Sequence, residues 1–214
     1  MRTRVKICGI TSREDASMVI DAGVDAIGLV FYEKSPRFIT VSQASEISLA
    51  VPAFVSCVAL FKDADVAFIR SVMQQVEVDL IQFHGSENAD FCEQFDRPYI
   101  KALGMKGPDS NVDYLLTSAQ HYHSAKALLL DGHLPGQAGG TGETFDWSAI
   151  AEVEKPVVLA GGLTPENIRQ AIQAVQPFAV DVSSGVESAP GIKDKEKVAR
   201  FMGQVMQQQA ADNE

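Results

Sequence analysis

A lysine and a cysteine stand two positions apart near the start of the chain, in Val5-Lys6-Ile7-Cys8-Gly9. The stretch is short, contains β-branched residues and ends at glycine, which predicts a buried strand. Because side chains alternate across a strand, Lys6 and Cys8 share one face at its carboxyl end. A nearby cation lowers the pKa of a thiol from about 8.5 towards neutrality. The pair therefore predicts a reactive cysteine rather than a small buried hydrophobe.

Polar side chains also close three other predicted strands: Gln82 with His84, Asp181 with Ser183, and Asp131 after three leucines. Polar groups inside a folded protein cost free energy unless they are paired or functional, so this clustering predicts a site. We interpret Asp131 as an acid or base. His84 fits equally a substrate contact and a hydrogen-bonded structural residue.

Two short glycine-containing stretches predict an anion site. They are Ala160-Gly161-Gly162-Leu163 and Ser183-Ser184-Gly185, and each follows a predicted strand. Their backbone N–H groups, beside helix N-termini, can bind phosphate without lysine or arginine. Of two substitutions there, Gly162→Asp should weaken anion binding more than Gly185→Ala. A longer glycine-rich loop covers 132–144, and it is either a further part of the site or a plain surface loop.

Arg37 lies in Ser35-Pro36-Arg37, in the loop after the second predicted strand. It is either a solvated surface charge or a two-pronged contact for a carboxylate. Cys57 and Cys92 fit ordinary buried positions, and no His or Cys spacing is typical of a metal site.

The net charge of −10 argues against nucleic acid or an anionic membrane as partner. The first apolar stretch is too short for a signal peptide or a membrane span. Three cysteines form no disulfide framework, which predicts a reducing, cytoplasmic location.

Eight short apolar runs alternate with helical patterns along the 214 residues. The predicted strands are Val5–Gly9, Ala26–Phe31, Ser56–Phe61, Leu80–His84, Tyr99–Leu103, Ala127–Asp131, Pro156–Ala160 and Phe178–Ser183. The alternation predicts a parallel sheet, and eight units predict a single (β/α)₈ barrel domain over 1–214, with the site at the carboxyl ends of the strands. A doubly wound open sheet is the alternative, but it normally has fewer strands.

Helix signals are present between the runs. Ser12 and Thr164 are predicted N-caps, with Pro165 in the first turn of the later helix. The last helix is predicted over Lys193–Gln207, and the polar end 207–214 is expected to fray.

The motifs together resemble phosphoribosylanthranilate isomerase along the whole chain. They are Lys6-Ile7-Cys8-Gly9-Ile10-Thr11, Ser35-Pro36-Arg37, Gln82-Phe83-His84-Gly85, Leu130-Asp131, Gly139-Gly140-Thr141-Gly142 with Phe145-Asp146-Trp147, Ala160-Gly161-Gly162-Leu163 with Asn167, and Asp181-Val182-Ser183-Ser184-Gly185-Val186-Glu187. Phe83 is a mild departure, since leucine is more usual there, but the position should face the helices.

The resemblance implies a (β/α)₈ barrel of tryptophan biosynthesis that works without metal or organic cofactor. It implies an Amadori rearrangement of N-(5-phosphoribosyl)anthranilate, with Asp131 as general acid and Cys8 as general base. The residues by themselves leave these two roles exchangeable. It further implies that Arg37 holds the anthranilate carboxylate and that the loops after strands seven and eight hold the phosphate.

The substrate-binding set that we expect is Lys6, Arg37, Gln82, His84, Gly161, Gly162, Leu163, Asp181, Ser183, Ser184 and Gly185. A small molecule is the expected partner, and we expect a monomer rather than a homodimer. Other phosphate-binding barrels, such as indole-glycerol-phosphate synthase or ribulose-phosphate epimerase, are alternatives, but their lysine acid or metal-binding aspartates are not evident. A non-catalytic sugar-phosphate sensor is the other alternative, and retention of Cys8 and Asp131 argues against it.

Overall fold

The computed structural model describes residues 2–105, 110–132, 150 and 153–211. Nearly all of the glycine-rich loop at 132–144 lies outside these ranges, as do the motif residues Phe145, Asp146 and Trp147.

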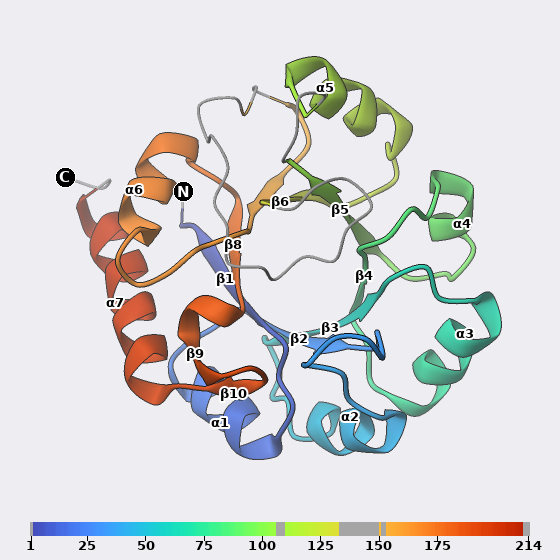
Figure 1. Ribbon diagram of the computed structural model, residues 1–214, viewed down its shortest axis with the longest axis horizontal. Coiled ribbons are helices and arrows are strands. Elements are labelled where there is room, and N and C mark those ends of the chain that lie inside the picture. Colours follow the sequence, from blue (N-terminus) through green and yellow to red (C-terminus); the bar gives the residue numbers. More distant parts are fainter. Residues whose placement is uncertain (1, 106–109, 133–149, 151–152, 212–214) are drawn as a thin grey trace.

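All eight predicted strands form, and together they close a parallel barrel in the order β1 to β8, with β8 pairing back onto β1 (Figure 1). The strands are β1 (Arg4–Cys8), β2 (Ala26–Val30), β3 (Ser56–Phe61), β4 (Leu80–Phe83), β5 (Tyr99–Gly104), β6 (Ala127–Asp131), β7 (Val157–Leu159) and β8 (Ala179–Val182). The barrel prediction is confirmed, and the open-sheet alternative is excluded.

The described helices lie around the outside of the ring of strands (Figure 1). They are α1 (Arg13–Asp21), α2 (Val41–Ser48), α3 (Val66–Gln75), α4 (Ala89–Glu93), α5 (Val112–His121), α6 (Ile168–Val175) and α7 (Lys195–Ala211). Five begin at a side chain that accepts a hydrogen bond from a first-turn backbone N–H, namely Ser12, Thr40, Asp65, Asn88 and Asn111.

Helix α6 begins later than the sequence predicts. Residues 165–167 form a turn, and Asn167 occupies the N-cap position without a capping bond. The Asn167 side chain instead accepts from the N–H of Thr164 and donates to the carbonyl of Gly162. It therefore fixes the connection between β7 and α6, and the prediction of Thr164 as N-cap is wrong.

The last helix also differs from expectation, since α7 continues beyond Gln207 to Ala211. Gln208, in the segment expected to fray, is only 3% exposed, and its side chain accepts a hydrogen bond from Gln173 of α6 at 2.9 Å. This buried contact between helices explains why the helical conformation persists there.

A small antiparallel hairpin separates β8 from α7, where no strand is predicted. It consists of β9 (Glu187–Ala189) and β10 (Ile192–Lys193), and follows the single 3₁₀ turn η2 (Ser184–Val186). Gly191 makes its turn at φ +82°. The Pro190-Gly191 pair is the signal that marks this hairpin in the sequence. Lys193 is thus a strand residue and does not begin the last helix.

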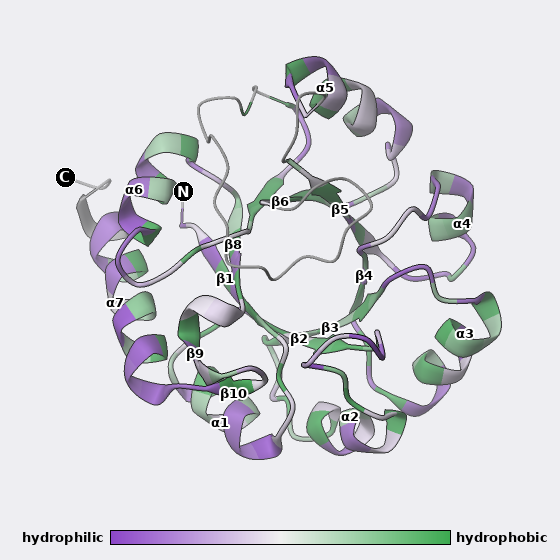
Figure 2. Ribbon diagram, in the orientation of Figure 1, coloured by the Kyte–Doolittle hydropathy of each residue, from purple (hydrophilic) through white to green (hydrophobic). Residues whose placement is uncertain are grey.

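Apolar side chains pack on both sides of the barrel wall. One cluster fills the barrel interior, because its member Ala179 lies on the same face of β8 as Asp181. The other members are Ile100, Ala102, Ala127, Leu129, Val158 and Ala160. A larger cluster lies between strands and helices. Figure 2 shows hydrophobic strands surrounded by helices whose hydrophilic residues lie mostly outward. Phe83 belongs to this outer layer and packs on Phe91 and Phe95, as expected.

Candidate active site

A cleft opens at the carboxyl ends of the strands, with an empty volume of about 890 Å³ that includes the part open to solvent. Eight strands ending at one rim bring together residues that are far apart in sequence. The predicted site residues that line it are Cys8, Arg37, Gln82, His84, Asp131, Gly161, Gly162, Leu163, Asp181, Ser183 and Ser184. Lys6 lies beneath this set and Gly185 lies behind Leu163, so neither lines the cleft.

Lys6 and Asp181 form a buried ion pair at the base of the cleft. They are register partners in β1 and β8, so their side chains point to the same face, and Nζ lies 2.8 Å from Oδ2. Burial by itself lowers the pKa of Lys6, but the Asp181 carboxylate and the Cys8 thiol raise it overall. Burial raises the pKa of Asp181, and the charge of Lys6 opposes that rise only in part.

Cys8 lies at the end of β1 beside Gly28 of β2, where a Cβ would fall 2.7 Å from its sulfur. Glycine at that position therefore makes room for the thiol. Burial raises the pKa of Cys8, while the cations of Lys6 and Lys193 oppose the rise. The expectation of a thiol pKa lowered towards neutrality is wrong, because desolvation and Asp181 outweigh the two cations.

Gln82, His84 and Asp131 form a row across the mouth from β4 to β6. Gln82 Nε2 lies 2.9 Å from His84 Nδ1, and His84 Nε2 lies 3.4 Å from Asp131 Oδ2. All three line the cleft. His84 thus contacts a candidate catalytic carboxylate: it is hydrogen-bonded and it also lines the cleft, so its contact with a substrate stays a prediction.

Arg37 is held by a carboxylate that the sequence did not single out. Its Nε and Nη2 each donate to one oxygen of Glu187, both at 2.8 Å. Hydrogen bonding to Glu187 raises the pKa of Arg37 against the effect of burial. Arg37 is therefore a fixed cation at the cleft rather than a mobile surface charge, and its side chain is 11% exposed.

The two glycine loops touch each other. Gly161 and Gly162 have φ values of +80° and +63°, a region that favours glycine. A Cβ on Gly185 would lie 1.8 Å from the carbonyl oxygen of Leu163. Within the described residues, no acceptor is bonded to the backbone N–H of Gly162 or Leu163. Two N–H donors thus remain available at the cleft.

Two buried oxygens also lack hydrogen-bond donors among the described residues, namely Gln82 Oε1 and Asp181 Oδ1. Buried acceptors are costly when unpaired, so a ligand that donates hydrogen bonds, such as a polyhydroxyl chain, suits this part of the cleft.

Sequence reasoning missed Glu187 and Lys193, which reach the site from the unpredicted hairpin. It also missed Tyr32, Lys34 and Lys62, which line the mouth from the loops after β2 and β3. Within the described ranges, no group of three or more His, Cys, Asp or Glu side chains is placed to hold a metal ion. The helices of those ranges include none long and apolar enough to cross a membrane.

A closed (β/α)₈ barrel with a thiol, carboxylates and glycine loops around one cleft at the carboxyl ends of its strands has the architecture of a barrel enzyme. The profile of the family described as N-(5'phosphoribosyl)anthranilate (PRA) isomerase matches residues 5–204. The chain belongs to this family, and it is an isomerase.

Individual relatives agree with this assignment. An N-(5'-phosphoribosyl)anthranilate isomerase of Cellvibrio japonicus is 50% identical over 98% of this chain and 96% of its own. The phosphoribosyl anthranilate isomerase of Thermotoga maritima superposes with a TM-score of 0.86 at 41% identity, covering 96% of this chain and 99% of that one. A further isomerase structure contains reduced 1-(o-carboxyphenylamino)-1-deoxyribulose 5-phosphate, and it has a TM-score of 0.80 at 36% identity over the same shares.

Proposed function

We propose that this chain isomerises N-(5-phosphoribosyl)anthranilate to 1-(o-carboxyphenylamino)-1-deoxyribulose 5-phosphate, a step of tryptophan biosynthesis. The observation that carries the proposal is the placement of Cys8 and Asp131 on one cleft, between a fixed arginine and two glycine loops. A substrate with a carboxylate at one end, hydroxyl groups in the middle and a phosphate at the other end matches that order of groups.

The reaction needs an acid and a base at the two atoms that flank C1′. An acid protonates the furanose ring oxygen, the C1′–O bond breaks, and an open-chain iminium forms. A base then removes the proton from C2′ to give an enolamine. This is protonated at C1′ while its C2′ hydroxyl loses a proton, which gives the aminoketone. We assign the acid to Asp131 and the base to Cys8, on strands β6 and β1.

The remaining groups bind and orient the substrate. Arg37 takes the carboxylate, and the N–H groups of Gly162, Leu163 and Ser184 take the phosphate, with Gly185 packed behind them. Asp181 Oδ1 and Gln82 Oε1 accept hydrogen bonds from sugar hydroxyls. Lys6 fixes the position of Asp181, and His84 orients Asp131. Ser183 supports the end of β1 by donating a hydrogen bond to the Cys8 carbonyl at 2.9 Å.

The test is a direct assay. The purified protein is mixed with freshly prepared phosphoribosylanthranilate, and the loss of anthranilate fluorescence is followed. We expect enzyme-dependent loss that far exceeds the spontaneous rate. A rate equal to that of buffer alone would overturn the proposal, and a protein heated to unfolding is the control.

We also propose that the chain acts as a monomer in the cytoplasm. Every group assigned to the cleft comes from one chain, so catalysis requires no second copy. All three cysteines are buried free thiols, as suits a reducing compartment. Light scattering during gel filtration should give a mass near 23.1 kDa, whereas twice that mass would contradict the monomer. Cell fractionation tests the location.

A further inference from the structure

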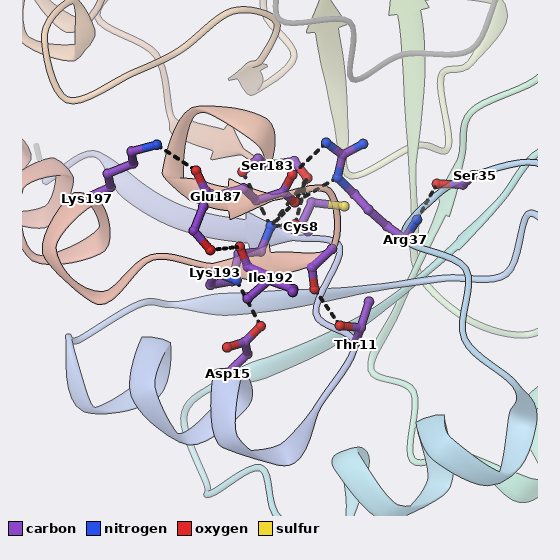
Figure 3. A network of polar contacts seen from close by, with 12 residues as sticks. Cys8, Thr11, Asp15, Ser35, Arg37, Ser183, Glu187, Ile192, Lys193 and Lys197 are labelled. Atoms are coloured by element: carbon purple, nitrogen blue, oxygen red, sulfur yellow. Dashed lines mark hydrogen bonds and ion pairs between the residues drawn. The ribbon is translucent and has the colours of Figure 1, made fainter.

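The β9–β10 hairpin is fastened to the parts of the barrel that carry Cys8 and Arg37 (Figure 3). Thr11, in the loop after β1, donates from Oγ1 to the carbonyl of Gly191 at 2.5 Å. The N–H of Lys193 donates to Asp15 of α1 at 2.9 Å. The hairpin therefore has a fixed position relative to the end of β1.

A buried lysine, Lys193, and a half-buried arginine, Arg37, share the single carboxylate of Glu187. Lys193 Nζ donates to Oε1 at 2.7 Å, and Arg37 holds both oxygens through Nε and Nη2. The exposed fractions of the side chains are 0% for Lys193 and 5% for Glu187. Lys193 Nζ also donates to the Cys8 carbonyl at 2.7 Å. The cluster has two positive charges and one negative charge, so it presents a net positive charge to the cleft.

The planar guanidinium of an arginine has two edges, and each edge can hold one carboxylate. Arginine has five N–H donors in one plane, and Glu187 engages one edge of that plane, Nε with Nη2. Among the described residues, no acceptor engages the other edge, Nη1 with the second hydrogen of Nη2, so this edge can hold another planar carboxylate. Because Arg37 lines the cleft, that carboxylate is one that enters the cleft.

We propose that Glu187, anchored by Lys193, is a positioning residue that sets the orientation of Arg37 and thereby the preference for a carboxylate-bearing substrate. The inference rests on the proposed function and adds a residue to it. A long side chain fixed before binding loses less entropy when the ligand arrives. Lys193 is needed as well, because the Arg37–Glu187 pair alone would be neutral and would offer no net charge to an anion.

The decisive variant is Glu187→Gln, which keeps the size of the side chain but removes the charge and one of the two acceptors. Calorimetry would measure the Kd of two ligands, reduced 1-(o-carboxyphenylamino)-1-deoxyribulose 5-phosphate and the same molecule without its carboxyl group. We expect the Kd of the first to rise about tenfold and that of the second to stay within about twofold. In turnover assays KM should rise while kcat changes less than about threefold.

Three further variants separate positioning from a general structural role. Glu187→Asp retains the charge on a shorter side chain that cannot reach both Arg37 and Lys193, so it should lose the same preference. In an Arg37→Ala background, Glu187→Gln should have no further effect on either ligand. Glu46→Gln, at an exposed position of α2, is the matched control and should bind like wild type.

The outcomes distinguish this inference from the proposed function. If wild type prefers the carboxylate ligand and folded Glu187→Gln retains that preference or binds more tightly, Glu187 merely masks Arg37 and the inference is overturned. Full rescue by Glu187→Asp would also overturn it, since charge alone would then suffice. If wild type binds neither ligand, the proposed function fails and this inference fails with it.

Discussion

At the scale of single residues, burial decides what the charged groups can do. Lys6 and Asp181 are removed from water together, and each compensates the other. Replacing one partner of such a pair leaves an uncompensated buried charge, at a cost of about 3–5 kcal/mol. The proposed chemistry at Cys8 therefore depends on this pair, of which Asp181 lines the cleft and Lys6 does not.

The first prediction concerns the proposed acid and base. Cys8→Ala and Asp131→Asn should each lower kcat by about 10²-fold or more, because each removes a proton transfer, with little change in substrate affinity. Steady-state kinetics on folded variants would test this. Near-normal kcat in either variant would remove that residue from its role.

The second prediction follows from the raised pKa of Cys8. A base must be deprotonated to act, and a thiol whose pKa is raised from the ordinary value of about 8.5 is mostly protonated at pH 7. We therefore expect kcat/KM to increase as pH rises from 6 to 9.5, without a plateau below about pH 9. A profile that is flat or falls across this range would argue that the Cys8 thiolate is not the base.

At the scale of elements, the connections at the carboxyl ends of the strands matter more than the strands themselves. The loop after β7 is bent by two glycines with positive φ and fixed by Asn167, and the loop after β8 packs directly on it. The hairpin that follows supports Arg37 and the end of β1. The segment between β8 and α7 therefore contributes both to the proposed phosphate site and, through Glu187, to the proposed carboxylate site.

The third prediction concerns the contact between the two glycine loops. Gly185→Ala is a small exchange in size, yet its Cβ would overlap the Leu163 carbonyl oxygen at 1.8 Å. Both loops must move, so KM should rise at least tenfold and the Tm should fall by several degrees. Gly203→Ala, in α7, where a Cβ meets nothing within 4 Å, is the control and should keep wild-type KM. Wild-type KM in Gly185→Ala would show that the loop contact is dispensable.

At the scale of the whole molecule, the net charge of −10 opposes the approach of an anionic substrate. The positive groups at the cleft are the Arg37–Glu187–Lys193 cluster, the lysines Lys34 and Lys62 at the mouth, and the proposed backbone N–H donors. We expect these local donors, rather than the long-range field, to govern the capture of substrate.

The fourth prediction concerns salt. Raising NaCl from about 0.01 M to 0.15 M shortens the screening length from about 30 Å to about 8 Å and weakens the general repulsion. We expect kcat/KM to stay constant or rise up to about twofold over that range. A decline of several-fold would mean that long-range attraction contributes to capture, and a salt without chloride or a carboxylate, such as sodium fluoride, controls for specific competition by chloride.

The strands and the start of α1 were determined by the sequence alone. Runs such as Leu128-Leu129-Leu130 and caps such as Ser12 act through neighbours in the chain, so local pattern suffices to predict them. The grouping of Cys8, Asp131, Gln82 and Asp181 also followed, because parallel strands in a closed barrel must end at one rim.

Only the tertiary structure decided the pKa of Cys8, the partner of Arg37 and the position of Lys193. Desolvation depends on how deeply a group is covered, and that depth is set by every surrounding element rather than by neighbours in sequence. Arg37 and Glu187 are 150 positions apart in the sequence, yet closure of the barrel between β8 and β1 brings Arg37 Nε to 2.8 Å from Glu187 Oε1. Contacts of this kind follow from how the ring of strands closes, which no local pattern encodes.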